Sequence, residues 1–291
     1  MKYGRISSLR HHHPLASLCR LLGVSESGYH AWHKRPLSSR AREEARLELE
    51  IKAAHQRTRE TCGPQRLQAD LSDHGVQVGL HRIRRIRRKL GLRCRQNRKF
   101  KATTDSRHAL PVAPNRLDRQ FAVAAPNQAW VTDITYVSTD QGWLYLAGVK
   151  DLFSGELVGY AMSECMTKAL VMQALFRAAA AKRPGKGLIH HSDRGSQYCA
   201  HDYQQLLRQF GMVPSMSRKG NCWDNAPMES FWGTLKTELV HHRHYVTREQ
   251  ARLDITEYIE IFYNRMRKQA RLGYLSPAAF TQKYYAGQLT A

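Results

Sequence analysis

The stretch AWVTDITYV, residues 129–137, begins the part of the chain that decides the fold. Apolar and β-branched side chains dominate it, and two similar runs follow, WLYLAGVKDLF at 143–153 and ELVGYAM at 156–162. Short turns separate the three runs, Asp-Gln-Gly at 140–142 and Ser-Gly at 154–155. Runs of this kind joined by such turns predict three strands in an antiparallel meander.

Helical and extended patterns alternate after the meander. We expect helices at 168–181, 201–210 and 225–239, strands at 187–191 and 213–216, and in the tail a helix at 248–264 and a segment begun by Pro277. Three strands followed by alternating helices and strands predict an α/β fold, in which a mixed sheet is flanked by helices.

The chain before residue 126 has a helical pattern instead. Leu15 to Val24 carries apolar residues at helical spacing, and Ser25 is placed to cap a second helix. A longer helix is expected from Glu43 to Arg57, and two shorter helices at 64–74 and 79–90. Short helices separated by tight turns predict a helix-turn-helix region.

The helix expected at 79–90, GLHRIRRIRRKL, has one apolar stripe and is basic around much of the rest. This pattern is typical of a recognition helix that contacts DNA. The alternative is a basic helix that only faces solvent. The arginines expected to contact DNA are Arg82, Arg84, Arg85, Arg87 and Arg88.

Positive charge is concentrated in the first third of the chain. Residues 1–110 hold 25 Lys and Arg against 9 Asp and Glu, whereas residues 111–291 hold 21 against 15, out of a net charge of +22. A basic region of this kind indicates a polyanionic partner, because each phosphate neutralised releases counterions. Residues 96–125 are polar and basic, and we expect them to form a linker that follows DNA.

Length and composition exclude several classes of protein. A chain of 291 residues with 42% hydrophobic residues predicts about two packed domains rather than disorder. The N-terminus lacks the apolar segment of a signal peptide, so we expect a cytoplasmic protein. The six cysteines have no CxxC pair and are expected to be free thiols. The His-rich runs at 11–13 and 241–244 lack zinc-ligand spacing, so we expect them to face solvent or phosphate.

Three acidic residues stand where a metal-dependent phosphoryl-transfer enzyme would need them. Asp133 lies inside an apolar strand, Asp193 directly follows the strand expected at 187–191, and Glu229 falls on a helix. Lys236 is two helical turns beyond Glu229 and Asn225 is one turn before it, so both are expected on the same helix face, toward DNA. The spacing alone is weak, because 11 Asp and 13 Glu produce such pairs by chance.

Longer motifs around these residues resemble a known family. WVTDITY at 130–136, HSDRGSQY at 191–198 and SRKGNCWDNAPMESFW at 217–232 resemble the catalytic blocks of the DDE transposases of insertion sequence family three. The helices before residue 93 and the Tyr-Asn at 263–264 with LGYLSP at 272–277 resemble the family's N-terminal and C-terminal regions. The resemblance therefore covers nearly the whole chain.

The resemblance implies a fold and an activity. It implies a ribonuclease H-like, retroviral-integrase-like core that cleaves DNA and joins strands at insertion-sequence ends, with two Mg²⁺ or Mn²⁺ ions held by Asp133, Asp193 and Glu229. It also implies binding to terminal inverted repeats and target DNA, oligomerisation on DNA, and a bacterial, nucleoid-associated protein made as a frameshifted fusion to an upstream frame. Two departures, Cys62 where the family often has Tyr and Gln269 where it often has His, do not touch the carboxylates.

The domain boundaries and the remaining DNA contacts follow from these assignments. Besides Lys236 and Asn225, we expect Arg218 and Lys219 of the third catalytic block to bind DNA. We expect an N-terminal helical region at 1–40, a helix-turn-helix domain at 41–95, the linker at 96–125, the catalytic core at 126–240 and a C-terminal helical extension at 241–291.

Two alternative functions stay open on the sequence. His191 and Arg194 fit the short His-x-x-Arg motif of tyrosine recombinases, with Tyr245 or Tyr263 as nucleophile. A DNA-binding regulator, or a decayed transposase that keeps only its arms, is the non-enzyme alternative. Trp223 and Trp232 are expected in the core more than as platforms for base stacking.

Overall fold

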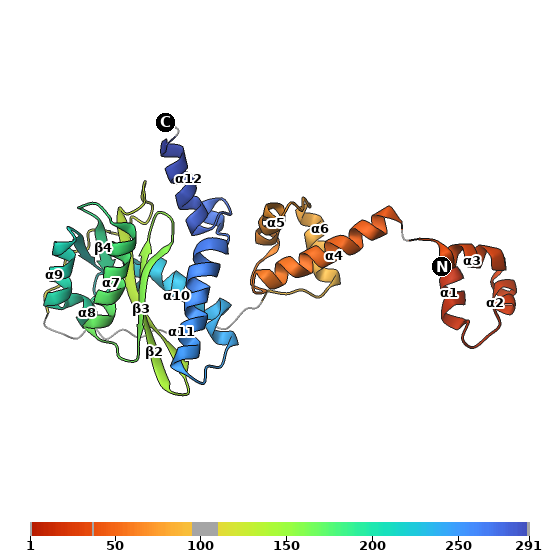
Figure 1. Cartoon of the computed structure of the whole chain (residues 1–291), viewed down its shortest axis with the longest axis horizontal. Helices are drawn as coiled ribbons and strands as arrows, with labels where there is room; N and C mark the ends of the chain where they lie inside the picture. The colour runs from red at the N-terminus through yellow and green to blue at the C-terminus, as the bar shows by residue number, and fades with distance from the viewer. Residues whose placement is uncertain (1, 37, 95–109, 290–291) are drawn as a thin grey trace. The chain divides into compact units, whose positions relative to one another are not determined.

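The computed structural model describes residues 2–36, 38–94 and 110–289 (Figure 1). The chain divides into two compact units, residues 1–52 and 53–291, which are described separately. Residues 96–109 of the linker predicted at 96–125 lie outside the described residues.

The first unit is a small helical cluster. It contains α1 (Lys2–Leu9), α2 (Leu15–Leu22), α3 (Glu26–Lys34) and the beginning of α4 (Ser39–Arg57). Gly23 ends α2 with a φ of 61°, and the Ser25 hydroxyl accepts a hydrogen bond from the Gly28 N–H at the start of α3. Ile6, Leu18 and Tyr29 form the core of the cluster. The two helices predicted after residue 14 are confirmed, whereas α1 was not predicted.

The second unit begins with the end of α4, then α5 (Pro64–Asp73) and α6 (Leu80–Lys89). Pro64 opens α5 at a position where its missing N–H is not needed, and the predicted bounds of both short helices are confirmed within one residue. Arg57 pairs with the largely buried Asp70 at 2.5 Å, which ties the end of α4 to α5.

A five-stranded sheet in the order β3-β2-β1-β4-β5 forms the centre of the rest of this unit. The strands β1 (Ala129–Thr139), β2 (Gly142–Asp151) and β3 (Leu157–Ser163) are the predicted antiparallel meander. The short strands β4 (Ile189–Ser192) and β5 (Val213–Met216) run parallel to β1. The sheet is therefore mixed, as predicted.

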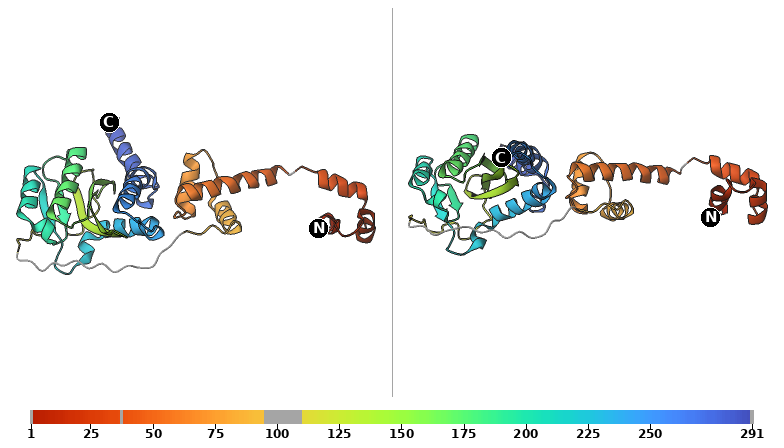
Figure 2. Two further views of the ribbon diagram at one scale, coloured as in Figure 1. Left: turned by 60° about the horizontal axis from the view of Figure 1, so that its bottom comes forward. Right: turned by 90° about the horizontal axis from the view of Figure 1, so that it is seen from below.

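Helices cover both faces of this sheet (Figure 2). Alternate residues of the strands point to opposite faces, so Trp130 and Val149 pack with α7 (Lys168–Lys182), α8 (Ser196–Cys199) and α9 (His201–Gln209). Val131 and Leu146 pack on the other side with α10 (Ala226–Glu238) and α11 (Arg248–Glu257). No helix among the described residues is long and apolar enough to cross a membrane.

The second half of the predicted linker is anchored to the core at Leu117. Leu117 is 2% exposed, and the Ser215 hydroxyl of β5 accepts hydrogen bonds from the backbone N–H groups of Arg116 and Leu117. The backbone of these two residues is held by β5, and the prediction that the segment follows DNA stays a prediction. Polar composition did not reveal the single buried leucine that anchors the segment.

The predicted helix at 248–264 changes its type part of the way along. The α-helical part α11 continues as the π-helix η3 (Tyr258–Met266). From η3 the Tyr263 hydroxyl donates to the Gly155 carbonyl, and the Asn264 side chain bonds both the N–H and the carbonyl of Leu157. Two tertiary contacts on consecutive residues thus accompany the wider turns. The chain ends in α12 (Pro277–Leu289).

A buried carboxylate joins three segments beside the end of β5. Asp224 is fully buried and accepts hydrogen bonds from Arg218, at 2.8 Å, from Arg119, at 2.8 Å, and from Asn115, at 3.1 Å. Hydrogen bonds from Arg218, above all, hold the pKa of Asp224 far below that of an ordinary aspartate. This carboxylate therefore stabilises the loop that precedes α10.

We expect Asp224→Asn to destabilise the fold by about 2 kcal/mol at pH 7, because hydrogen bonds to a charged group are removed. Since the folded pKa is depressed, the carboxylate stabilises the protein above the unfolded pKa, near 4, and this contribution is lost as the pH falls. Urea unfolding should therefore show a gap between wild type and variant that narrows from pH 6 to pH 3. A gap independent of pH would contradict the ionic role.

Candidate active site

Two of the predicted acidic residues lie at the same edge of the sheet. Strands β1 and β4 are parallel, and Val131 is in register with His191. Asp133 follows Val131 by two residues within β1, and Asp193 follows His191 by two residues, just beyond the end of β4. The negative charge of Asp193 acts on Asp133, so the two carboxylates lie near each other. The Oδ1 atom of Asp193 accepts a hydrogen bond of 2.9 Å from the Gly195 N–H, which orients this carboxylate at the beginning of α8.

The third acidic residue is carried by α10, whose beginning is tied to the sheet by two side chains. Asn225 donates from Nδ2 to the carbonyl of Thr132 at 3.0 Å, and the buried Lys150 of β2 donates from Nζ to the carbonyl of Pro227 at 2.8 Å. Glu229 lies in the first turn of α10 and is exposed to solvent. These bonds set where Glu229 stands relative to Asp133.

Loss of solvation, more than neighbouring charge, raises the pKa of Asp133 and of Glu229. Burial, followed by the negative charge of Asp193, raises the pKa of Asp133, and the charge of Glu229 contributes less. Burial also raises the pKa of Glu229. Asp133 and Asp193 therefore repel each other when both are ionised, a situation that a divalent cation would relieve.

The arrangement fits a metal site that is only partly assembled. Among residues 2–36, 38–94 and 110–289, no three His, Cys, Asp or Glu side chains lie close enough together to hold a metal ion. Asp133 and Asp193 are an oxygen pair of the kind that Mg²⁺ and Mn²⁺ prefer, and Glu229 faces solvent one helix away. Asp133 and Asp193 could hold an ion, with Glu229 of α10 as the third acidic residue nearby.

Lys236 lies close to this cluster, on the same helix as Glu229. Its Nζ is 5.1 Å from the centre of the Tyr136 ring, a cation–π contact on β1. Burial lowers the pKa of Lys236, and the negative charge of Asp133 opposes that change. These interactions place Lys236 beside β1 near Asp133, and the prediction that it shares one side of the site with Glu229 stays a prediction.

Two tryptophans on either side of Glu229 differ in their surroundings. Trp223, in the turn at Cys222–Asn225, is 67% exposed, so the expectation that it belongs to the core is wrong. Trp232 is buried as expected, but its Nε1 donates to Oδ2 of Asp133 at 3.1 Å. The sequence did not indicate this bond, because it depends on how α10 packs over β1.

The residues predicted to bind DNA beside the site divide into two groups. Lys219 is exposed next to Gly220, whereas the Arg218 guanidinium pairs with Asp224 and Asp118. Asn225 is only 4% exposed and bonds the Thr132 carbonyl. In this arrangement the buried Asn225 side chain is not placed to contact DNA, so the prediction that it binds DNA is corrected. Its role here is to fix α10 on β1.

The arginines of α6 also divide. Arg84, Arg85 and Arg88 are exposed and Arg82 is partly exposed, as a helix that contacts phosphate requires. Arg87 is buried, and its Nη2 donates to Sγ of Cys94 at 3.3 Å. Arg87 is therefore a packing residue here, and its predicted contact with DNA is wrong in this arrangement. The helical repeat puts it on the same stripe as Ile83 and Ile86.

The tyrosine-recombinase alternative requires an accessible tyrosine. Tyr245 is 4% exposed and Tyr263 is 3% exposed, and both belong to the core between the sheet and the C-terminal helices. Burial raises the pKa of each hydroxyl, which makes both tyrosines poorer nucleophiles. The structure thus disfavours this alternative.

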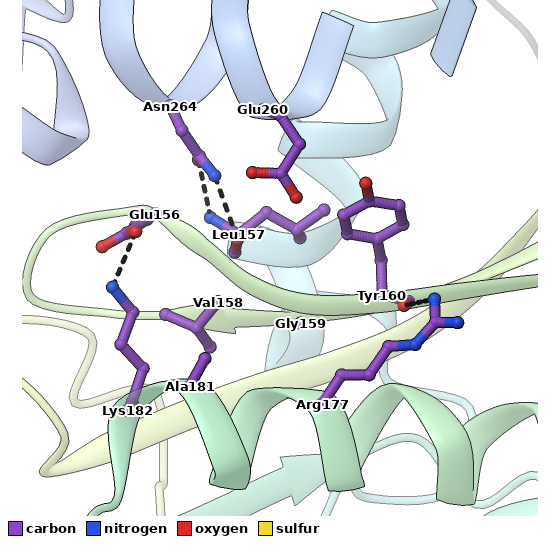
Figure 3. Close-up of a pocket in the computed structure, with 10 residues that line it drawn as sticks. All are labelled: Glu156, Leu157, Val158, Gly159, Tyr160, Arg177, Ala181, Lys182, Glu260 and Asn264. Carbon is purple, nitrogen blue, oxygen red and sulfur yellow. Dashed lines mark hydrogen bonds and ion pairs between the residues drawn. The ribbon is translucent and has the colours of Figure 1, made fainter. Parts of the chain in front are cut away.

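A hollow of about 270 Å³ lies elsewhere, along β3 between α7 and η3 (Figure 3). Its polar groups are paired with one another: Lys182 bonds Glu156 at 2.7 Å, and Arg177 donates to the Tyr160 carbonyl. Asn264 bonds the backbone of Leu157 (Figure 3), and Arg252 donates to the Met162 carbonyl. These side chains cover the outer edge of β3, and none of the three predicted acidic residues lines the hollow.

Known proteins share this organisation. Family models described as "Integrase core domain" match residues 123–222 and 229–284, and one described as "HTH-like domain" matches residues 41–100. The chain is 58% identical to the "Insertion element IS600 uncharacterized 31 kDa protein" of Shigella sonnei, over 92% of this chain and 98% of that protein.

Two further comparisons concern a transposase and a solved structure. The chain is 38% identical to "Transposase InsF for insertion sequence IS3A" of Escherichia coli K12, over 98% of this chain and 100% of the relative. The structure of the HTLV-2 integrase catalytic core domain in complex with magnesium, in its trimeric form, is 14% identical, with a TM-score of 0.44, over 55% of this chain and 99% of that one.

The matches to the family models and the similarity to these insertion-sequence proteins define the class. The protein has an integrase core of the ribonuclease H-like fold behind a helix-turn-helix region, and it is a DDE-type polynucleotidyl transferase. More particularly, the chain belongs to the transposases of the IS3 family of insertion sequences.

We expect Asp193→Asn to stabilise the metal-free protein by about 1 kcal/mol, as removal of charge strain from an active site often does. Because the raised pKa of Asp133 means that ionisation opposes folding, wild type in EDTA should lose stability as the pH rises from 5 to 8, and the variant should lose less. Thermal unfolding across that range is the measurement. A variant less stable than wild type in EDTA would contradict the repulsion.

Proposed function

We propose that the protein cleaves DNA at insertion-sequence ends and joins the freed strand to target DNA by metal-dependent phosphoryl transfer, without a covalent enzyme intermediate. The observation that carries this proposal is the placement of Asp133 on β1 near Asp193, which directly follows the parallel strand β4, with Glu229 on α10. A nucleophilic tyrosine is not needed in this chemistry, in keeping with the buried Tyr245 and Tyr263.

Asp133, Asp193 and Glu229 would hold two Mg²⁺ or Mn²⁺ ions. Bound there, such ions activate the attacking oxygen, from water and then from the DNA 3′-hydroxyl, and stabilise the leaving oxygen. The protein itself contributes position, because Gly195 orients Asp193 while Asn225 and Lys150 fix α10.

DNA contacts near the site are assigned by exposure and charge. We assign Lys236 to a DNA phosphate, because a protonated lysine cannot bind a metal ion but can pair with phosphate beside Glu229. Lys219 is assigned to the DNA backbone. Trp223 is assigned to stacking on a base near the cleaved end, since it is exposed in the turn that leads into α10.

The wider assembly is proposed from the family. We propose that the chain acts as part of a frameshifted fusion with an upstream frame, forms a homo-oligomer on terminal inverted repeats, and works on the bacterial nucleoid. The predicted domain divisions at residues 40, 95, 125 and 240 belong to the same proposal, with Leu117 of the linker anchored to the core.

Strand transfer should stop in excess EDTA and return with Mg²⁺ or Mn²⁺. Asp133→Asn, Asp193→Asn and Glu229→Gln should each lower cleavage by more than about 100-fold, beyond the usual effect of disturbing an outer-shell partner, while DNA binding persists. Cleavage of a labelled insertion-sequence end and a binding assay on the same DNA are the two measurements. Near-normal strand transfer by any one variant would refute the assigned site.

Replacing Arg84, Arg85 and Arg88 with Gln should weaken DNA binding and flatten its salt dependence, by about 0.9 in the logarithmic slope for each phosphate that is no longer neutralised. Arg183, Lys186 and Arg208, also exposed, provide a control triple variant with the same change in charge. Binding isotherms between low and moderate salt give both slopes. If the two triple variants had equal slopes, α6 would not contact DNA.

A further inference from the structure

The Trp232 side chain makes a specific contact with the active site from inside the core. It is 5% exposed and packs in the cluster between the sheet and α10, with the Phe231 ring 4.9 Å away between centres. Its Nε1 nevertheless donates to Oδ2 of Asp133 at 3.1 Å. A residue whose only role was to fill the core would not need a polar atom at this position.

A glycine of the sheet leaves space for this indole. Gly148 of β2 is the residue paired with Asp133 across the antiparallel ladder. A Cβ atom at Gly148 would lie 2.9 Å from Cη2 of Trp232 and 2.6 Å from Cε of Met228, closer than such atoms approach. The glycine therefore lets the indole lie over β2 and reach the neighbouring strand at the level of Asp133.

The chemistry of the donor suits a carboxylate that must still bind a cation. The indole N–H can only donate and carries no charge. A lysine or arginine at this place would neutralise Asp133 and compete with a metal ion, whereas the indole occupies one oxygen and leaves the negative charge in place. Partners of this kind fix the orientation of metal-binding carboxylates in many sites.

We propose that Trp232 is a positioning residue, whose indole N–H holds Oδ2 of Asp133 so that the other carboxylate oxygen is presented to the catalytic metal ion. The inference rests on the proposed metal role of Asp133. Because Trp232 follows Glu229 by three residues on α10, the helix that carries one acidic residue also orients another. The separation between Asp133 and Glu229 is thereby set through a single helical turn.

The test is Trp232→Phe in the full chain, which removes the N–H and keeps an aromatic ring. Mn²⁺ binding without DNA, followed by the electron paramagnetic resonance signal of free Mn²⁺, should weaken by about 10- to 100-fold. Saturating Mn²⁺ should restore cleavage toward the wild-type rate, since the acidic residues are intact. Trp130→Phe is the matched control, because Trp130 is also buried and donates to Asn127 away from the carboxylates, and it should bind Mn²⁺ as wild type does.

A measurement on the wild-type protein covers the case in which Trp232→Phe does not fold. In ¹⁵N-tryptophan-labelled protein, Mg²⁺ should shift the indole N–H resonance of Trp232, because its acceptor becomes a metal ligand, and should leave that of Trp130 in place. Asp133→Asn should abolish the shift.

The possible results separate the two hypotheses. Wild-type Mn²⁺ affinity in folded Trp232→Phe, or a Trp232 resonance unmoved by Mg²⁺, would overturn the positioning role while leaving the metal site standing. Unchanged Mn²⁺ binding by Asp133→Asn would instead refute the metal site itself, and the positioning role with it.

Discussion

The parallel pairing of β1 with β4 is the constraint on which the rest of the catalytic core depends. The register of residues 129–131 with 189–191 brings Asp133 near Asp193, which follows the end of β4, although their charges repel. The apolar residues of the same strands, such as Val131, bury their side chains against the helices and keep the pairing in place. Folding thus forces together two groups that alone would separate.

Around these aspartates, hydrogen-bond donors are more common than ion pairs with oppositely charged side chains. A backbone N–H orients Asp193 and an indole N–H meets Asp133, while the Asn225 amide and the Lys150 ammonium hold α10 through carbonyl oxygens. The strong ion pairs lie farther along: Arg267 binds Glu238 near the end of α10 at 2.8 Å, and Arg218 binds Asp224 before its start. These two ion pairs hold α10 at both ends without placing an arginine on Asp133 or Glu229.

Much of this architecture could be predicted from the sequence. The bounds of β5 and α6, and the capping of α3 by Ser25, followed from local patterns of apolar residues and caps. Tertiary contacts were harder to predict from the sequence. Asn225 and Arg87 are polar residues whose burial depends on packing partners, and a single leucine, Leu117, decides that an otherwise polar segment joins the core. The bond from Trp232 to Asp133 links residues 99 positions apart and has no local signature.

The covered edge of β3 has a consequence for how the chain must be made. Asn264 occupies the outward N–H and carbonyl of Leu157, and Arg177 and Arg252 occupy two further carbonyls of the strand. A nascent or truncated chain that stopped short of residue 264 would present an open strand edge, a template to which other chains add. Incomplete chains would therefore tend to aggregate, whereas a chain that includes the C-terminal block covers this strand edge and resists aggregation.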